Sequence, residues 1–151
     1  MTKKTASAGT LAARLAAQQS KLSYSRIPAE GRHEQLPPES VKAVKRLLLD
    51  YLGVAIAGSQ SESGVVARAF AAQQGRAAEA TLIGGNGRVP MAAAAFANAI
   101  SCHSIELDDI DVLALFHFSP PVFSPALAVG EAVGAGGREL ITALAAGCEV
   151  M

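Results

Sequence analysis

Between residues 38 and 58, apolar positions recur every three or four residues, which places them on one face of an α-helix. That face is made by Val41, Val44, Leu48, Tyr51, Leu52 and Ala55. Lysine, arginine and aspartate side chains occupy the opposite face. Pro38 suits a first helical turn, where no backbone N–H is needed, and Gly58 suits a helix end. The pattern therefore predicts a helix from Pro38 to Gly58.

Four later segments carry the same helical period. In chain order they are residues 61–71, 91–100, 122–133 and 138–150. Ser61 or Ser63 would cap the first of these helices, and Gly75 would end its segment. Pro90 opens the second helix, whose small alanine side chains let neighbouring helices approach closely. We expect this alanine-rich helix to be buried.

The segment Ala80–Ile83 differs from the rest because it is short, partly β-branched and followed directly by the turn-forming residues Gly84–Gly87. It predicts one strand or extended piece. The glycines lack the spacing and the following Lys-Ser/Thr pair of a phosphate-binding loop, so we predict no nucleotide cofactor here. The fold class is therefore mainly α, with one short extended segment near residues 80–84.

The chain divides into an arm and a domain. Residues 1–35 form an N-terminal arm in which Leu11–Gln19 could form a short helix; the arm is basic as far as residue 29. Its Ser- and Ala-rich composition is also compatible with an organelle transit peptide. Residues 36–151 carry the helical pattern, which still runs at Met151 without a cap. We expect residues 36–151 to be part of a larger helical domain.

Charge and hydropathy exclude several classes of partner. The 13 basic and 13 acidic side chains cancel, so no net field favours nucleic acid or an anionic membrane surface. No apolar run reaches the roughly 18–20 residues needed to cross a bilayer. Cys102 and Cys148 stand apart without metal-ligand spacing, which favours buried, reduced thiols. We expect a cytoplasmic protein.

The candidate chemistry lies between residues 103 and 119, where the helical pattern is lost. His103, Glu106, Asp108 and His117 fall within fifteen positions. Histidine exchanges a proton near neutral pH, and a nearby carboxylate can fix its tautomer or act as a base itself. If the preceding helix continues through Glu106, this side chain lies on the same face as His103. The four residues predict a site for general acid–base catalysis.

Other roles fit the same residues. Asp109 and Asp111 suit the capping of turns and helix starts through their side-chain oxygens. A structural hydrogen bond explains His103 and His117 as well as catalysis does. A metal hydrolase is a further alternative, in which the His103 and Glu106 pair joins one loop aspartate as ligands, although no second motif repeats this spacing.

This loop is also strongly acidic, and no lysine or arginine lies between Arg88 and Arg138. A negatively charged substrate would be repelled, since two like charges about 4 Å apart cost roughly 4 kcal/mol at an effective dielectric constant of about 20. If the loop binds such a substrate, cations from elsewhere must compensate, or some of these acids must be neutral or capped.

Four segments in this order carry a resemblance to a known family. They are LLLDYLGVAIAG at residues 47–58, ATLIGG at 80–85, AAFANAISCHSIELDD at 94–109 and GRELITALAAGCEV at 137–150. In sequence and spacing the chain resembles the N-terminal portion of MmgE/PrpD proteins, from about Leu36 onward.

The resemblance implies a mainly helical domain built from both ends of a longer chain, a smaller α/β domain, a homodimer and no obligatory metal or organic cofactor. The family's active-site segment His-x-x-Asp-Phe-Asp-Asp-Thr falls on His103, Glu106, Asp108 and the neighbouring Asp109, and its later histidine on His117. This sequence has Glu106 in place of the first aspartate and Ile110 in place of the threonine.

The activity implied is that of a lyase, which dehydrates or decarboxylates a small polycarboxylic acid such as 2-methylcitrate or cis-aconitate. His117 would carry the proton, and Glu106 would be its partner or would hold substrate. Asp108 and His103 would support the loop. An isomerase or epimerase of a dicarboxylate and a non-catalytic helical or dimerisation module are the alternatives. We expect the chain to lack part of the active site.

Overall fold

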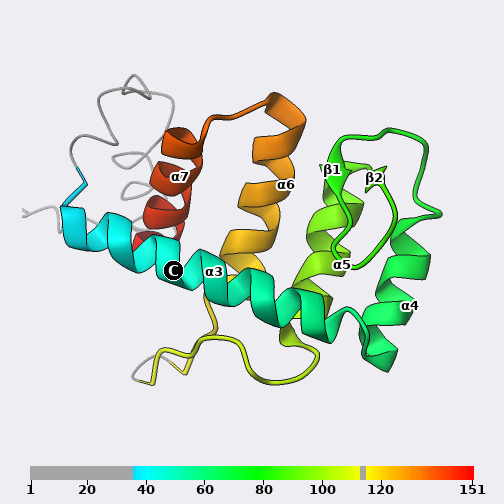
Figure 1. Cartoon of the computed structure of the whole chain (residues 1–151), viewed down its shortest axis with the longest axis horizontal. Helices are drawn as coiled ribbons and strands as arrows, with labels where there is room; N and C mark the ends of the chain where they lie inside the picture. The colour runs from blue at the N-terminus through cyan, green and yellow to red at the C-terminus, as the bar shows by residue number, and fades with distance from the viewer. Residues whose placement is uncertain (1–35, 113–114) are drawn as a thin grey trace, which may run out of the picture.

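The computed structural model describes residues 36–112 and 115–151. In this part of the chain there are five α-helices and a small two-stranded sheet, which lies at one side of the molecule beside α5 (Figure 1). The elements are α3 (Pro38–Gly58), α4 (Glu62–Ala71), β1 (Ala80–Thr81), β2 (Arg88–Val89), α5 (Met91–His103), η2 (Ser119–Phe123), α6 (Ser124–Val133) and α7 (Gly137–Val150). The mainly α fold class predicted from the hydrophobic pattern is confirmed. The predicted arm, with its short helix at Leu11–Gln19, lies outside the described residues.

Helix α3 has the bounds that the sequence predicts, and Figure 1 shows it running across α5, α6 and α7 on one side of the molecule. Its buried face includes Val44, Tyr51 and Ala55. The hydroxyl of Tyr51 forms a buried hydrogen bond, 2.9 Å long, with Oγ of Ser124 at the start of α6. This bond joins two elements 73 positions apart and fixes the beginning of α6 against α3.

Helix α5 is the centre of the packing, because it contacts α3, α4, α6 and η2. Its small side chains make this possible, as predicted. It is not buried all round, however, since Met91 and Phe96 on its outer face are exposed. The helix also continues three residues beyond Ile100 and ends at His103.

The helices approach most closely where α3 ends. A Cβ atom built on Gly58 would lie 1.9 Å from the backbone oxygen of Ser101 in α5, a separation that no side chain can occupy. Gly58 therefore permits the contact between α3 and α5 that brings the end of α5 into place.

The extended segment near residue 80 is not isolated. Strand β1 pairs with β2 in an antiparallel hairpin, with Ala80 opposite Val89. The prediction of a single extended piece missed β2, because two residues are too few to show an alternating pattern. Asn98 of α5 holds the hairpin in place: its side chain accepts a hydrogen bond from the N–H of Ile83 and donates one to the carbonyl of Thr81, each 2.9 Å long.

Two groups of buried apolar residues form the core. The first lies among α4, α5, α6 and the hairpin and consists of Ala67, Ala71, Ala80, Leu82, Val89, Ala93, Ala94, Ala97 and Ala128. The second lies among α3, α5, η2, α6 and α7 and consists of Val44, Tyr51, Ala55, Cys102, Val122, Phe123 and Leu144. The loop between α5 and η2 thus starts and ends at elements that the second group holds together.

The last two helices follow the prediction with one addition. Residues 119–123, predicted in part to begin a helix, form the π-helical turn η2 ahead of α6. Helix α7 starts at Gly137, one position earlier than predicted. None of the described helices has the length and apolar character needed to cross a membrane.

Candidate active site in the loop after helix α5

The loop from Ser104 to Phe118 leaves the end of α5 and returns to η2, below α3 in the view of Figure 1. All four predicted site residues lie at its two ends or within it. His103 is the last residue of α5, and His117 stands two residues before η2 begins. The structure brings these two side chains together, with ring centroids 4.8 Å apart.

Asp108 is the residue that joins the two histidines. Its side chain is 0 % exposed. Nδ1 of His103 donates to both of its carboxylate oxygens, at 3.2 Å and 3.0 Å. Nδ1 of His117 lies 3.1 Å from the same Oδ2. One buried carboxylate therefore faces both imidazole rings.

The contact between Asp108 and His117 is close without being a hydrogen bond. Nδ1 of His117 is buried and has no hydrogen-bond partner among the described residues. The angle at this nitrogen is thus unfavourable although the 3.1 Å distance is short. The pair is held by the fold and not by a hydrogen bond of its own.

Glu106 lies on the other side of His103, where its Oε1 is 3.5 Å from Nε2. The two were expected to meet on one helical face, and that reasoning is wrong, because α5 ends at His103. The backbone of Glu106 instead adopts a left-handed conformation with φ of 53°. This conformation turns the chain back, so the side chain still reaches His103 from outside the helix.

The two histidines differ in what surrounds them. Both ring nitrogens of His103 face carboxylates, Asp108 at Nδ1 and Glu106 at Nε2. The hydrogen bond to Asp108 is the main cause that raises the pKa of His103 above its ordinary value, against a smaller opposing effect of burial. A protonated His103 would bring positive charge into this acidic loop.

Asp109 anchors the far end of the loop. Its carboxylate accepts hydrogen bonds from the backbone N–H groups of Phe118, at 3.2 Å, and Ser119, at 2.9 Å. The predicted capping role of Asp109 is thereby confirmed. Asp111 takes part in an isolated antiparallel bridge with Phe116, which narrows the loop just before His117.

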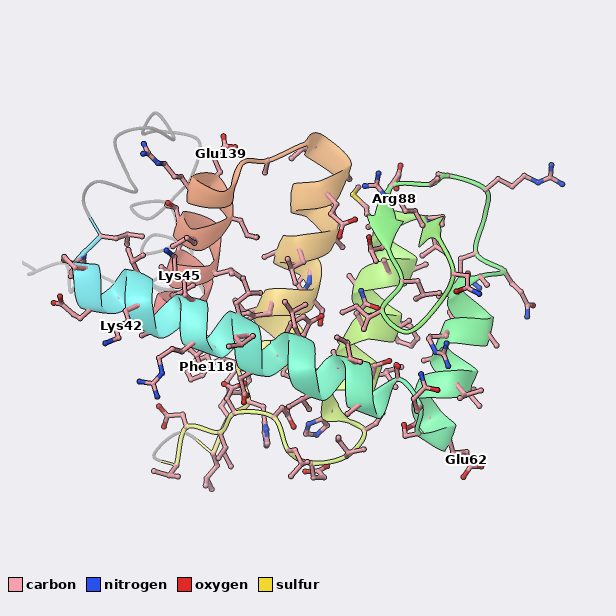
Figure 2. All side chains as sticks on the ribbon, viewed as in Figure 1. Lys42, Lys45, Glu62, Arg88, Phe118 and Glu139 are labelled. Atoms are coloured by element: carbon pink, nitrogen blue, oxygen red, sulfur yellow. The ribbon has the colours of Figure 1, made fainter. Side chains whose placement is uncertain are left out.

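Lysine and arginine do not pair with the site acids in the described part of the chain, where Glu106 and Asp108 form ion pairs with histidine. Figure 2 shows Lys42 and Lys45 on α3, and Arg88 at the hairpin, at the other end of α5 from the loop. Arg88 is itself paired with Glu131 at 3.4 Å. The acidic character predicted from the sequence is therefore kept in the fold.

The cysteines offer no reactive thiolate. Both are free, and Cys102 is fully buried, whereas Cys148 is partly buried. Burial is the main cause that raises the pKa of Cys102 to about 12 and that of Cys148 to about 11. Both thiols are protonated at neutral pH, which excludes them as nucleophiles there.

Sequence reasoning did not predict which of the four residues contact one another. It made Glu106 either the partner of His117 or the group that holds substrate, and it gave Asp108 and His103 a supporting place in the loop. In the structure Asp108 lies between the histidines, whereas Glu106 contacts His103 alone of the two. Nothing in the sequence distinguishes Asp108 from the other acids of the loop, because its burial depends on how the loop folds over α5.

One of three comparisons with known proteins gave a match. The family model described as the MmgE/PrpD N-terminal domain matches residues 25–151. Curated proteins and solved structures gave no match.

Proposed function

The chain belongs to the MmgE/PrpD family, and on that premise we propose that the loop after α5 contributes the proton-transfer residues of a lyase that acts on a small polycarboxylic acid. The observation that carries the proposal is the buried carboxylate of Asp108, which faces the imidazoles of both His103 and His117. A carboxylate at one ring nitrogen fixes the orientation of a histidine and stabilises its protonated form.

His117 is the better candidate for the proton carrier. Nδ1 of His117 faces Asp108, so Nε2 is the nitrogen left to exchange a proton with substrate. His103 has carboxylates at both ring nitrogens, and we assign it the role of neutralising charge and positioning Asp108.

The chemistry proceeds by removal of a proton next to a carboxylate. His117 takes the proton from this carbon, the electron pair of the C–H bond forms a carbon–carbon double bond, and the hydroxyl on the adjacent carbon leaves as water after it takes up a proton. A general base of this kind contributes typically about 10²–10⁴-fold to a rate. In a decarboxylation, the bond between a carbon and its carboxylate breaks, carbon dioxide leaves, the electron pair stays with the carbon, and protonated His117 donates a proton to that carbon.

Substrate binding needs positive charge that the described residues do not place at the loop. Two or three carboxylates on the substrate would face Glu106 and Asp108, and like charges in one site oppose binding. We propose that another polypeptide segment supplies lysine or arginine side chains to this face. Binding to the chain alone should accordingly be weak.

Deuterium exchange tests the proton transfer separately from complete turnover. The purified chain is incubated in D₂O, with a chelator, at millimolar concentrations of 2-methylcitrate, cis-aconitate or a dicarboxylate, and NMR follows exchange and product. We expect exchange at the carbon next to a carboxylate, slowed on the order of 100-fold or more in His117→Ala. Glu62→Gln, a change at an exposed acid of α4, should leave it unchanged.

The same spectra discriminate among the alternatives. Loss of water or carbon dioxide supports a lyase, whereas exchange with inversion and no loss of atoms supports an epimerase. Equal exchange rates in wild type and His117→Ala would show that His117 is not the proton carrier and would favour a helical assembly module.

A further inference from the structure

The same loop has the composition and geometry of a metal site. One nitrogen from each of His103 and His117 and one oxygen of Asp108 all lie within 4.8 Å of one another. We propose that these three residues bind a divalent transition-metal ion. The ligand set differs from the metal alternative considered from the sequence, because Glu106 is replaced by His117.

Two of the three separations between the ligand atoms suit an ion placed among them, and all three atoms lie within 4.8 Å of one another. Metal bonds of about 2.0–2.2 Å to nitrogen and oxygen put neighbouring ligands about 3.0 Å apart at a right angle and about 3.4 Å apart at a tetrahedral angle. Oδ2 of Asp108 is 3.0 Å from Nδ1 of His103 and 3.1 Å from Nδ1 of His117. Binding of one ion by all three atoms would require the rings of His103 and His117 to turn toward it.

The state of His117 is a second, independent observation. Its buried Nδ1 lies against a carboxylate oxygen without a hydrogen bond. A buried imidazole nitrogen this close to a carboxylate lacks a partner unless a proton or a cation, in suitable geometry, joins the two groups. A metal ion would satisfy both groups, and it would replace the proton that His103 donates to Asp108.

Glu106 provides the outer contact that metal-binding histidines usually have. A histidine that binds a metal through one nitrogen commonly donates the other N–H to a carboxylate, which fixes the ring and increases its basicity. Nε2 of His103 faces Oε1 of Glu106 at 3.5 Å, on the side away from Asp108. His103 could thus bind a metal ion through one nitrogen while its other nitrogen faces the carboxylate of Glu106.

The donor set selects the class of ion. Two imidazoles and one carboxylate favour zinc, iron, cobalt or nickel over magnesium and calcium, which prefer oxygen ligands. Three protein ligands also leave coordination positions for water or a substrate carboxylate. In a consequence that rests on the proposed function, metal on Nδ1 of His117 would keep Nε2 protonated, so the metal-bound loop could not act as a base.

Calorimetry with Zn²⁺ and visible absorption with Co²⁺, on the full chain after treatment with a chelator, test the proposal. We expect saturable binding of one ion per chain. His103→Ala, His117→Ala and Asp108→Asn should each weaken binding by more than about 10-fold, since loss of even an outer-shell partner costs about 10–100-fold. His103 is the most exposed of the three ligands, so His103→Ala is the variant least disturbing to the fold.

Two matched controls separate this site from binding to other surface groups. His33→Gln removes a histidine outside the described residues, and Glu62→Gln removes an exposed acid; both should bind as wild type does. No saturable binding by wild type, or unchanged affinity in His103→Ala and His117→Ala, would overturn the proposal. The exchange assay is run with chelator, so failure of either proposal leaves the result for the other intact.

Discussion

Nδ1 of His117 lies 3.1 Å from Oδ2 of Asp108, a carboxylate whose side chain is wholly buried. The two residues belong to opposite ends of a loop, and neither belongs to a helix. Their contact depends on both ends of the loop being fixed. The end of α5 fixes the first, at His103, and the hydrogen bond from the N–H of Ser119 to Asp109 fixes the second. The proposed proton transfer and the proposed metal site both depend on this contact.

The titration of His103 reports on the hydrogen bond to Asp108. We expect Asp108→Asn to lower the pKa of His103 toward its ordinary value of about 6.5, because a neutral amide no longer stabilises the imidazolium. NMR titration of the imidazole nitrogens in the presence of a chelator measures this change. Glu62→Gln serves as the control, and an unaltered pKa of His103 in Asp108→Asn would contradict the assignment.

Stability should depend on pH with a defined sign. A raised pKa in the folded state means that the ion pair stabilises the protein fully below the unfolded-state pKa, and that this contribution is lost as pH rises through the folded-state pKa. The free energy of unfolding of wild type should therefore exceed that of His103→Gln at low pH, and the difference should shrink as pH rises through the folded-state pKa of His103. Chemical denaturation at a series of pH values measures the difference.

The backbone of Glu106 predicts an effect that separates strain from charge. Its left-handed conformation, with φ of 53°, costs a residue with a side chain about 1–2 kcal/mol, and glycine avoids most of this cost. Glu106→Gly should be more stable than Glu106→Ala by about 1 kcal/mol, as measured by urea denaturation. Both variants lack the carboxylate, so the comparison isolates the backbone. Equal stability of the two would show that the turn is not strained.

Two glycines of α3 should respond oppositely to the same change. Gly58→Ala places a methyl group against the backbone of Ser101 and should destabilise the protein by about 3 kcal/mol or more, because neither helix can give way cheaply. A methyl group on Gly53 would meet no neighbouring side chain or helix within 4 Å, so Gly53→Ala should stabilise by about 0.5–1 kcal/mol. Thermal denaturation of the pair gives the result, and destabilisation of similar size in both would refute the close packing of α3 on α5.

Much of the fold is local in origin, and the sequence predicts it. The bounds of α3 follow from apolar spacing and from Pro38 and Gly58. Ser61 caps the start of α4, because its side chain accepts a hydrogen bond from the N–H of Gly64 at 3.1 Å. The partner strand β2 did not show in the sequence. Its two residues pair with β1 across a turn where Gly84 and Gly87 have positive φ, and Asn98 of the neighbouring helix α5 donates a hydrogen bond to the carbonyl of Thr81.

By itself the sequence determined the family to which the chain belongs, and it predicted four candidate site residues, because both depend on residue type and order. It did not determine which acid faces which histidine. That was decided by the end of α5 at His103, the left-handed turn at Glu106 and the burial of Asp108. The physical reason is that a loop carries no periodic pattern: its side chains are placed by the elements at its two ends and by the capping bonds of Asp109, which exist only once those elements have packed.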